Sequence, residues 1–167
     1  MEKETTSPMS MLLAGLIWDK VKSDSDEAFK EYMRSAKMGC KEAQFFVAFF
    51  YPRGIGVSLN QFRALKWYKK SAKAGKVSAM NNLGVMYMEG LGTLKNKKKG
   101  FVYLRCAADQ GSTVAAKNIA IYATRGALSR HGIPFTSTRG FSVQDITGSD
   151  GSDIEARSLN GKSHHHR

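Results

Sequence analysis

Two runs of apolar residues in the middle of the chain have the three- and four-residue spacing of one α-helix face: Leu65, Tyr68 and Ala72, then Ala79, Leu83, Met86 and Tyr87. Gly75 separates the two runs. Gly90 follows the second run, where a glycine adopts the positive φ that closes a helix. The pattern therefore predicts a helical hairpin.

This hairpin is one copy of a repeat with a period of 36 residues. Residues of one type recur at this interval in four sets: Ala28 and Ala64; Gly39, Gly75 and Gly111; Ala43, Ala79 and Ala115; Gly54, Gly90 and Gly126. Asp24, Asn60 and Asn96 also share one repeat position, each just before a first helix, where a side-chain oxygen accepts hydrogen bonds from free backbone N–H groups. A period of this length indicates stacked copies of one unit, so the sequence predicts an all-α solenoid.

The repeat divides the chain into a solenoid, residues 1–126, and a tail, residues 127–167. We expect an N-terminal half repeat at 9–22 and hairpins at 27–51, 63–89 and 99–125. A signal sequence or membrane helix is the alternative for the half repeat, although its run of about ten apolar residues is too short to span a bilayer. The tail is rich in Gly and Ser and is predicted to be mostly disordered. Two of its segments, Ile133-Pro134-Phe135 and Phe141-Ser142-Val143, are candidates to dock on the last hairpin. We do not count the run His164 to His166 as a metal site.

Several segments resemble the Sel-one-like repeat (SLR) family, a relative of the tetratricopeptide repeats. The resemblance is strongest at residues 54–92, through Gly54-Ile55-Gly56, Trp67-Tyr68 and Glu89-Gly90-Leu91-Gly92, and it covers about 9–126. The flanking copies depart from the pattern: Glu31 and Tyr103 replace Trp67, Gly100 replaces Ala64, and Leu128 replaces the second loop glycine. The resemblance implies an α-solenoid, which we expect to be right-handed, that binds proteins, usually as an adaptor or regulator. An antagonist of a toxin or phage component and a secreted effector are the alternative roles.

The charge of the chain is unevenly distributed. The net charge is +12, and residues 53–105 hold twelve Lys or Arg against the single acid Glu89. Five basic residues lie at matching positions of two successive first helices and form a predicted basic stripe: Lys30, Arg34, Lys66, Lys70 and Lys73. The resemblance implies that first helices line a concave groove. We therefore expect a partner protein with an acidic segment, while a solvated face without a target is the alternative.

Nucleic acid is the rival class of partner. A sequence pI near 9.8 and the run Trp67-Tyr68-Lys69-Lys70 offer phosphate neutralisation and aromatic rings for base stacking. However, Trp67 and Tyr68 also fit the apolar core pattern of the repeat, and no known nucleic-acid-binding module is visible. An anionic membrane surface is a weaker alternative, and the oligomeric state is not predicted.

The sequence argues against an enzyme and predicts no cofactor. All four histidines lie in the tail, at His131 and His164 to His166, so the repeats lack the commonest general base. The pair Gly54-Ile55-Gly56 follows a predicted helix, whereas a dinucleotide fingerprint follows a strand.

The two cysteines bear on the cellular compartment. Cys40 and Cys106 stand at different repeat positions. The resemblance implies a disulfide within each repeat of some secreted relatives, but this chain has alanines at those positions. Two unpaired thiols favour the reducing cytoplasm, with export by a route without a visible signal peptide as the alternative.

Overall fold

The computed structural model describes residues 7–17 and 24–125. Within them the chain forms seven α-helices, one short 3-10 helix and no strand: α1 (Pro8–Ile17), α2 (Ser25–Lys37), α3 (Lys41–Phe50), η2 (Tyr51–Arg53), α4 (Gln61–Lys73), α5 (Val77–Glu89), α6 (Lys97–Asp109) and α7 (Thr113–Thr124). The prediction of an all-α fold is confirmed. Three predicted features lie outside the described residues: the tail, its docking segments Ile133-Pro134-Phe135 and Phe141-Ser142-Val143, and residues 18–22 of the half repeat.

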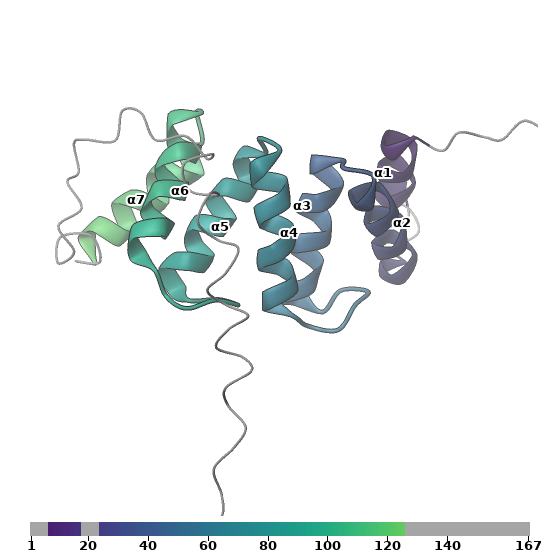
Figure 1. Cartoon of the computed structure of the whole chain (residues 1–167), viewed down its shortest axis with the longest axis horizontal. Coiled ribbons are helices and arrows are strands. Elements are labelled where there is room, and N and C mark those ends of the chain that lie inside the picture. The colour runs from purple at the N-terminus through teal and green to yellow at the C-terminus, as the bar shows by residue number, and fades with distance from the viewer. Residues whose placement is uncertain (1–6, 18–23, 126–167) are drawn as a thin grey trace, which may run out of the picture.

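The helices stand in a row along the long axis of the molecule, and each packs against the helix before it and the helix after it (Figure 1). The pairs α2–α3, α4–α5 and α6–α7 occupy the three expected hairpin ranges, and α1 packs on α2. Buried side chains from all seven helices form one continuous hydrophobic core. The molecule is therefore held together by contacts between neighbours in sequence, as expected of a repeat array.

The first helix of each hairpin begins in the same way. Asp24 accepts hydrogen bonds from the backbone of Asp26 and Glu27, at 3.2 Å each. Asn60 and Asn96 accept from the backbone N–H three residues later, both at 2.9 Å. These contacts confirm the predicted caps, each of which satisfies a backbone donor that the first turn leaves free.

The loops after the first two hairpins each return to the start of that hairpin's first helix. A Cβ on Gly56 would lie 2.2 Å from the carbonyl oxygen of Ser25, and a Cβ on Gly92 would lie 2.4 Å from that of Gln61. Ser25 and Gln61 are 36 residues apart, so the same contact closes two successive units. Only glycine permits this approach of two backbones.

Gly75 behaves differently from what the sequence suggested. The two helices of a hairpin are expected to approach closely at Gly75 and Ala79. Ala79 is fully buried, but a Cβ on Gly75 would meet no atom within 4 Å, so the expectation is wrong for Gly75. Gly75 has a φ of +86°, so the turn requires glycine for its backbone conformation rather than for space.

Helices α5 and α6 approach each other closely at two glycines. A Cβ on Gly84 would lie 2.7 Å from Leu104 Cγ, and one on Gly100 would lie 2.6 Å from Met88 Cγ. The two glycines face each other, since each Cβ would also lie within 3.0 Å of the other's carbonyl oxygen. The departure of Gly100 from the repeat pattern therefore has a packing reason.

Buried serines add hydrogen bonds between successive units. Ser35 on α2 donates to the carbonyl of Pro8 at the start of α1, and Ser71 on α4 donates to that of Lys41 at the start of α3 (2.7 Å). Both serines are fully buried, so their hydroxyls need these partners. The bonds tie α2 to α1 and α4 to α3, whereas α6 has Ala107 at the matching position.

Candidate partner-binding groove

A cavity of about 400 Å³ opens between α2 and α4. We call it the groove, and its lining comes from one residue of α2, five of α4 and two at the connection before α4: Met33, Tyr51, Asn60, Phe62, Arg63, Lys66, Trp67 and Lys70. The lining combines apolar or aromatic side chains with three cations. Residues three and four positions apart lie on one face of a helix, so α4 presents both kinds of side chain to the groove.

Each cation of the groove lies over an aromatic ring. The Lys66 ammonium is 4.6 Å from the centroid of the Phe62 ring, and the Lys70 ammonium is 4.4 Å from that of Trp67. The Arg63 guanidinium lies 5.9 Å from the ring of Tyr51. The negative face of an aromatic ring attracts a cation, so these contacts orient the three charges at the groove.

No carboxylate of the described chain forms an ion pair with Arg63, Lys66 or Lys70. Lys66 and Lys70 are exposed at the groove, and so is Arg63. An aromatic ring carries no net charge, so it does not neutralise the cation that lies over it. The groove therefore offers three oriented and uncompensated positive charges to a ligand.

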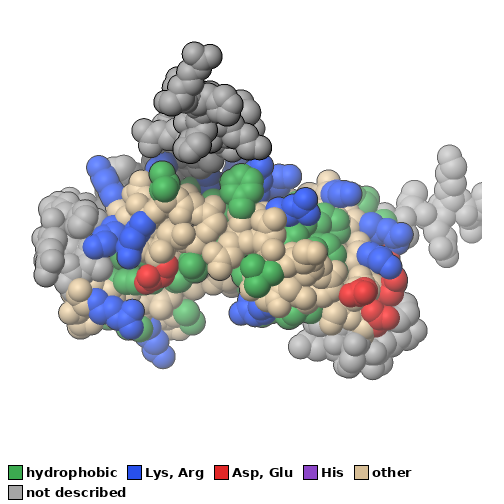
Figure 2. Space-filling model, turned by 90° about the horizontal axis from the view of Figure 1, so that it is seen from below, with side chains coloured by type: hydrophobic (Ala, Val, Ile, Leu, Met, Phe, Trp, Pro, Cys, Tyr) green, Lys and Arg blue, Asp and Glu red, His purple; other side chains and the backbone are tan. Residues whose placement is uncertain are grey.

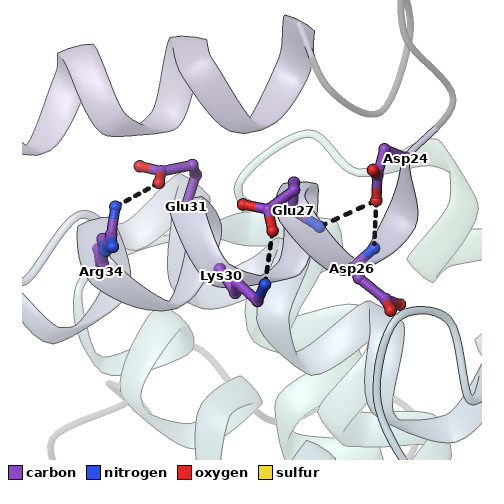
Figure 3. A network of polar contacts seen from close by, with 6 residues as sticks. All are labelled: Asp24, Asp26, Glu27, Lys30, Glu31 and Arg34. Carbon is purple, nitrogen blue, oxygen red and sulfur yellow. Dashed lines mark hydrogen bonds and ion pairs between the residues drawn. The ribbon is translucent and has the colours of Figure 1, made fainter.

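The basic residues of α2 are in a different state. Lys30 pairs with Glu27 at 2.5 Å, and Arg34 pairs with Glu31, each across one turn of the helix (Figure 3). The hydrogen bond and charge of Glu27 raise the pKa of Lys30. The predicted stripe is thus electrically uneven, because its α2 half is largely compensated. The sequence carries this information, since both acids stand three residues before their partners.

Lys73, the last member of the stripe, is exposed near the end of α4 and does not line the groove. On α6 the matching positions hold no base: Val102 is half-buried, Cys106 is buried, and Asp109 pairs with Arg105 at 3.0 Å. Of the five predicted residues, the structure thus places Lys66 and Lys70 together in the groove. The groove also contains Arg63 and the rings of Tyr51 and Phe62, which are not among the five predicted stripe residues.

The surface reflects the uneven charge of the chain. On the face shown in Figure 2, Lys and Arg are spread along the molecule, whereas Asp and Glu gather mainly at the end that holds α2. The groove lies where this acidic end meets the basic middle of the solenoid.

Trp67, which the sequence placed in the core, has two roles. It is half-buried and packs against the hydrophobic core, and it also lines the groove beneath Lys70. Tyr68 is buried, with 3% of its surface exposed. Tyr68 therefore offers no ring face for base stacking, and Lys70 lies over the ring of Trp67.

Residues 7–17 and 24–125 contain no cluster of three His, Cys, Asp or Glu side chains that is suited to a metal ion. No helix in these ranges combines the length and the apolar character needed to cross a membrane. Neither Cys40 nor Cys106 forms a disulfide.

Two stretches of the sequence, residues 41–76 and 77–112, match the Sel1 repeat family. The chain is a Sel1-repeat protein. Each match is 36 residues long, which is the period read from the sequence, and each begins where a second helix begins, at Lys41 of α3 and Val77 of α5. The Sel1 unit therefore joins the second helix of one hairpin to the first helix of the next.

Solved structures show the same fold. A Sel1 repeat protein from Oxalobacter formigenes has a TM-score of 0.66 and 33% sequence identity over 71% of this chain, which spans 50% of that protein. A protective antigen of uropathogenic Escherichia coli with an SLR fold has a TM-score of 0.69 and 24% identity, over 71% of this chain and 26% of its own. Cysteine-rich protein B of Helicobacter pylori has a TM-score of 0.59 and 18% identity, over 67% of this chain and 85% of its own. No curated protein sequence matches the chain.

These relatives confirm the predicted SLR solenoid. Sel1 repeats are generally protein-protein interaction modules and are typically non-catalytic scaffolds.

Proposed function

We propose that this protein binds a partner protein through the groove between α2 and α4, and that the groove receives an acidic segment of that partner. The observation that carries the proposal is the cluster of Arg63, Lys66 and Lys70, each over an aromatic ring and none paired with a carboxylate of the described chain. The protein then acts as an adaptor, a regulator or an antagonist rather than as an enzyme.

The composition of the groove supports a protein ligand. Met33, Phe62 and Trp67 offer apolar surface, and the cations at the rim attract acidic side chains of the same segment. Aromatic residues, Met and Arg are enriched where proteins meet, whereas charge alone gives mainly attraction at long range. A groove with both kinds of group favours a segment in which acidic and apolar residues are interspersed.

The five stripe residues contribute unequally to this proposal. Lys66 and Lys70 contact the ligand directly, and Lys73 extends the positive surface along α4. Lys30 and Arg34 contribute less, because a carboxylate of the partner must compete there with Glu27 and Glu31.

The proposed compartment is the cytoplasm, since neither thiol is in a disulfide and a reducing environment keeps thiols in that state.

Nucleic acid is the alternative class of partner, which the test must distinguish from a protein. Lys70 already covers the Trp67 ring at 4.4 Å, which argues against stacking of a base at that position.

The test is capture of partners from cells of the source organism on the full chain, with and without nuclease, at low and at raised salt. We expect a discrete protein that survives nuclease and is lost as salt rises, because salt screens charge contacts at a surface. Recovery that disappears with nuclease would instead make this chain a nucleic-acid binder, and a protein whose capture is indifferent to salt would exclude the cations as its main contact.

A further inference from the structure

A second cavity, of about 200 Å³, lies between η2, α4 and α5, and shares no lining residue with the groove. We call it the α5 pocket. Its apolar wall is formed by Val85, Met86 and Leu91, and its polar wall includes Arg53, Tyr68 and Asn82. An apolar cavity of about 150 Å³ holds a benzene ring, so the α5 pocket has room for a compact group.

The hydroxyl of Tyr68 is held so that its proton remains available. Asn82 donates to this oxygen through Nδ2 at 3.0 Å, and no side chain or carbonyl of the described chain accepts from the hydroxyl. Burial raises the pKa of Tyr68, although the hydrogen bond from Asn82 and the charge of Arg53 act in the opposite direction. The hydroxyl therefore keeps its proton at neutral pH and has a hydrogen bond still to donate.

A chain of amide groups fixes the orientation of Asn82. Its Oδ1 accepts from Asn81 Nδ2 at 3.1 Å, and Asn81 Oδ1 accepts from Asn118 Nδ2 of α7 at 2.8 Å. Because its oxygen is engaged in this chain, Asn82 must present its nitrogen to Tyr68. A ligand in the pocket therefore meets the hydroxyl donor of Tyr68 rather than the side-chain oxygen of Asn82.

Arg53 supplies the second donor and a positive charge. Its guanidinium lies 3.6 Å from the centroid of the Phe49 ring, and Nη1 donates to the Phe49 carbonyl at 3.1 Å. These two contacts orient the guanidinium at the pocket and leave further N–H groups available. A buried donor beside a fixed guanidinium is an arrangement that suits an anionic oxygen.

We propose that the α5 pocket binds a carboxylate that carries a compact apolar group. The carboxylate accepts from Tyr68 and Arg53, and the apolar group lies against Val85, Met86 and Leu91. This chemistry has two sources, a free organic acid or the C-terminal residue of a peptide. The site does not depend on the proposed function of the groove.

The test uses the full chain labelled with ¹⁵N and follows titrations by NMR. The probes are N-acetyl-leucine, its amide, and a five-residue peptide ending in leucine with a free or an amidated C-terminus. We expect saturable binding of the free carboxylates below about 10 mM, with both amides weakened about tenfold or more. A peptide that binds more tightly than N-acetyl-leucine would identify a chain terminus as the source, and equal affinity would identify a small acid. Equal binding of acids and amides, or no saturation by any acid, would overturn the proposal.

Two matched variants locate the binding. Arg53→Gln should weaken binding of the acid probe about tenfold. Arg63→Gln makes the same change in the groove and should leave the affinity for this probe unaltered. Tyr68→Phe should also weaken the acid, and its thermal unfolding shows whether the variant remains folded. Equal losses in Arg53→Gln and Arg63→Gln would mean that the probe responds to overall charge, which would contradict a specific site.

Discussion

Gly75 and Gly92 both have positive φ, at +86° and +67°, but their surroundings differ. A Cβ on Gly75 would have open space, whereas a Cβ on Gly92 would press on the carbonyl of Gln61. The repeat period marks both glycines as special positions, yet it cannot separate a requirement of the backbone from a requirement of space. That distinction depends on which loop returns to which helix, and only the folded chain shows it.

Replacement of each glycine by alanine separates the two requirements. Gly75→Ala should cost about 1–2 kcal/mol of unfolding free energy, the usual cost of a left-handed conformation for a residue with a Cβ. Gly92→Ala should cost at least about 1 kcal/mol more, because the loop must also move away from α4. Denaturant unfolding of the two variants measures the difference, and equal losses would show that the return contact does not stabilise the fold.

At the scale of elements, the packing of α5 on α6 depends on the absence of side chains. The repeat position of Gly84 recurs as Ala120 on α7, which is exposed. The two positions are therefore equivalent in sequence but not in burial, which makes them a matched pair.

Gly84→Leu should destabilise the protein by about 3 kcal/mol or more, because the new side chain meets Leu104 and the backbone of Gly100. Ala120→Leu should change the stability by less than about 0.5 kcal/mol, since the new side chain enters solvent. Thermal and denaturant unfolding of both variants provide the measurement. A small loss in Gly84→Leu would mean that α5 and α6 are not closely packed.

A titratable contact joins the last helix to the solenoid. Burial, together with a hydrogen bond and the charge of Glu89, raises the pKa of Tyr122 on α7 to about 12, although Arg125 lowers it. Below pH 10 the tyrosine is protonated in both states, so its contribution is constant. Between about pH 10 and 12 the unfolded chain releases this proton and the folded chain keeps it, so stability falls with rising pH.

Tyr122→Phe removes this titration, and its stability should therefore fall less steeply than that of the parent protein between pH 10 and 12. Unfolding midpoints across this range for the two proteins give the slopes. Parallel curves would show that Tyr122 titrates alike in the folded and unfolded chain.

At the scale of the whole molecule, the sequence predicts the fold well because each unit contacts mainly its neighbours. Two features are local in sequence, the pairing of helices and the caps at Asp24, Asn60 and Asn96. The 36-residue repeat therefore predicts both. The groove is less predictable. Basic spacing alone treats Lys30 and Lys66 as equivalent, whereas Glu27 compensates the first and the Phe62 ring orients the second.

Some features of the groove are predictable from the sequence alone. The acids three residues before Lys30 and Arg34 are visible in the sequence, as is Phe62 four residues before Lys66. The contribution of Tyr51 could not be found in this way, because it comes from the preceding unit and reaches Arg63 only in the stacked solenoid.

Partner binding by the uncompensated cations of the groove can be tested by charge reversal. The most direct measurement compares partner capture by the parent chain, by Lys66→Glu/Lys70→Glu, and by the control Lys98→Glu/Lys117→Glu. Both double variants make the same change in net charge at exposed positions, but the control residues lie on α6 and α7, away from the groove. We predict that the groove variant stays folded and captures at least about tenfold less partner than the parent chain, while the control captures as much as the parent. Equal capture by both variants, or equal loss in both, would contradict a specific role for the groove.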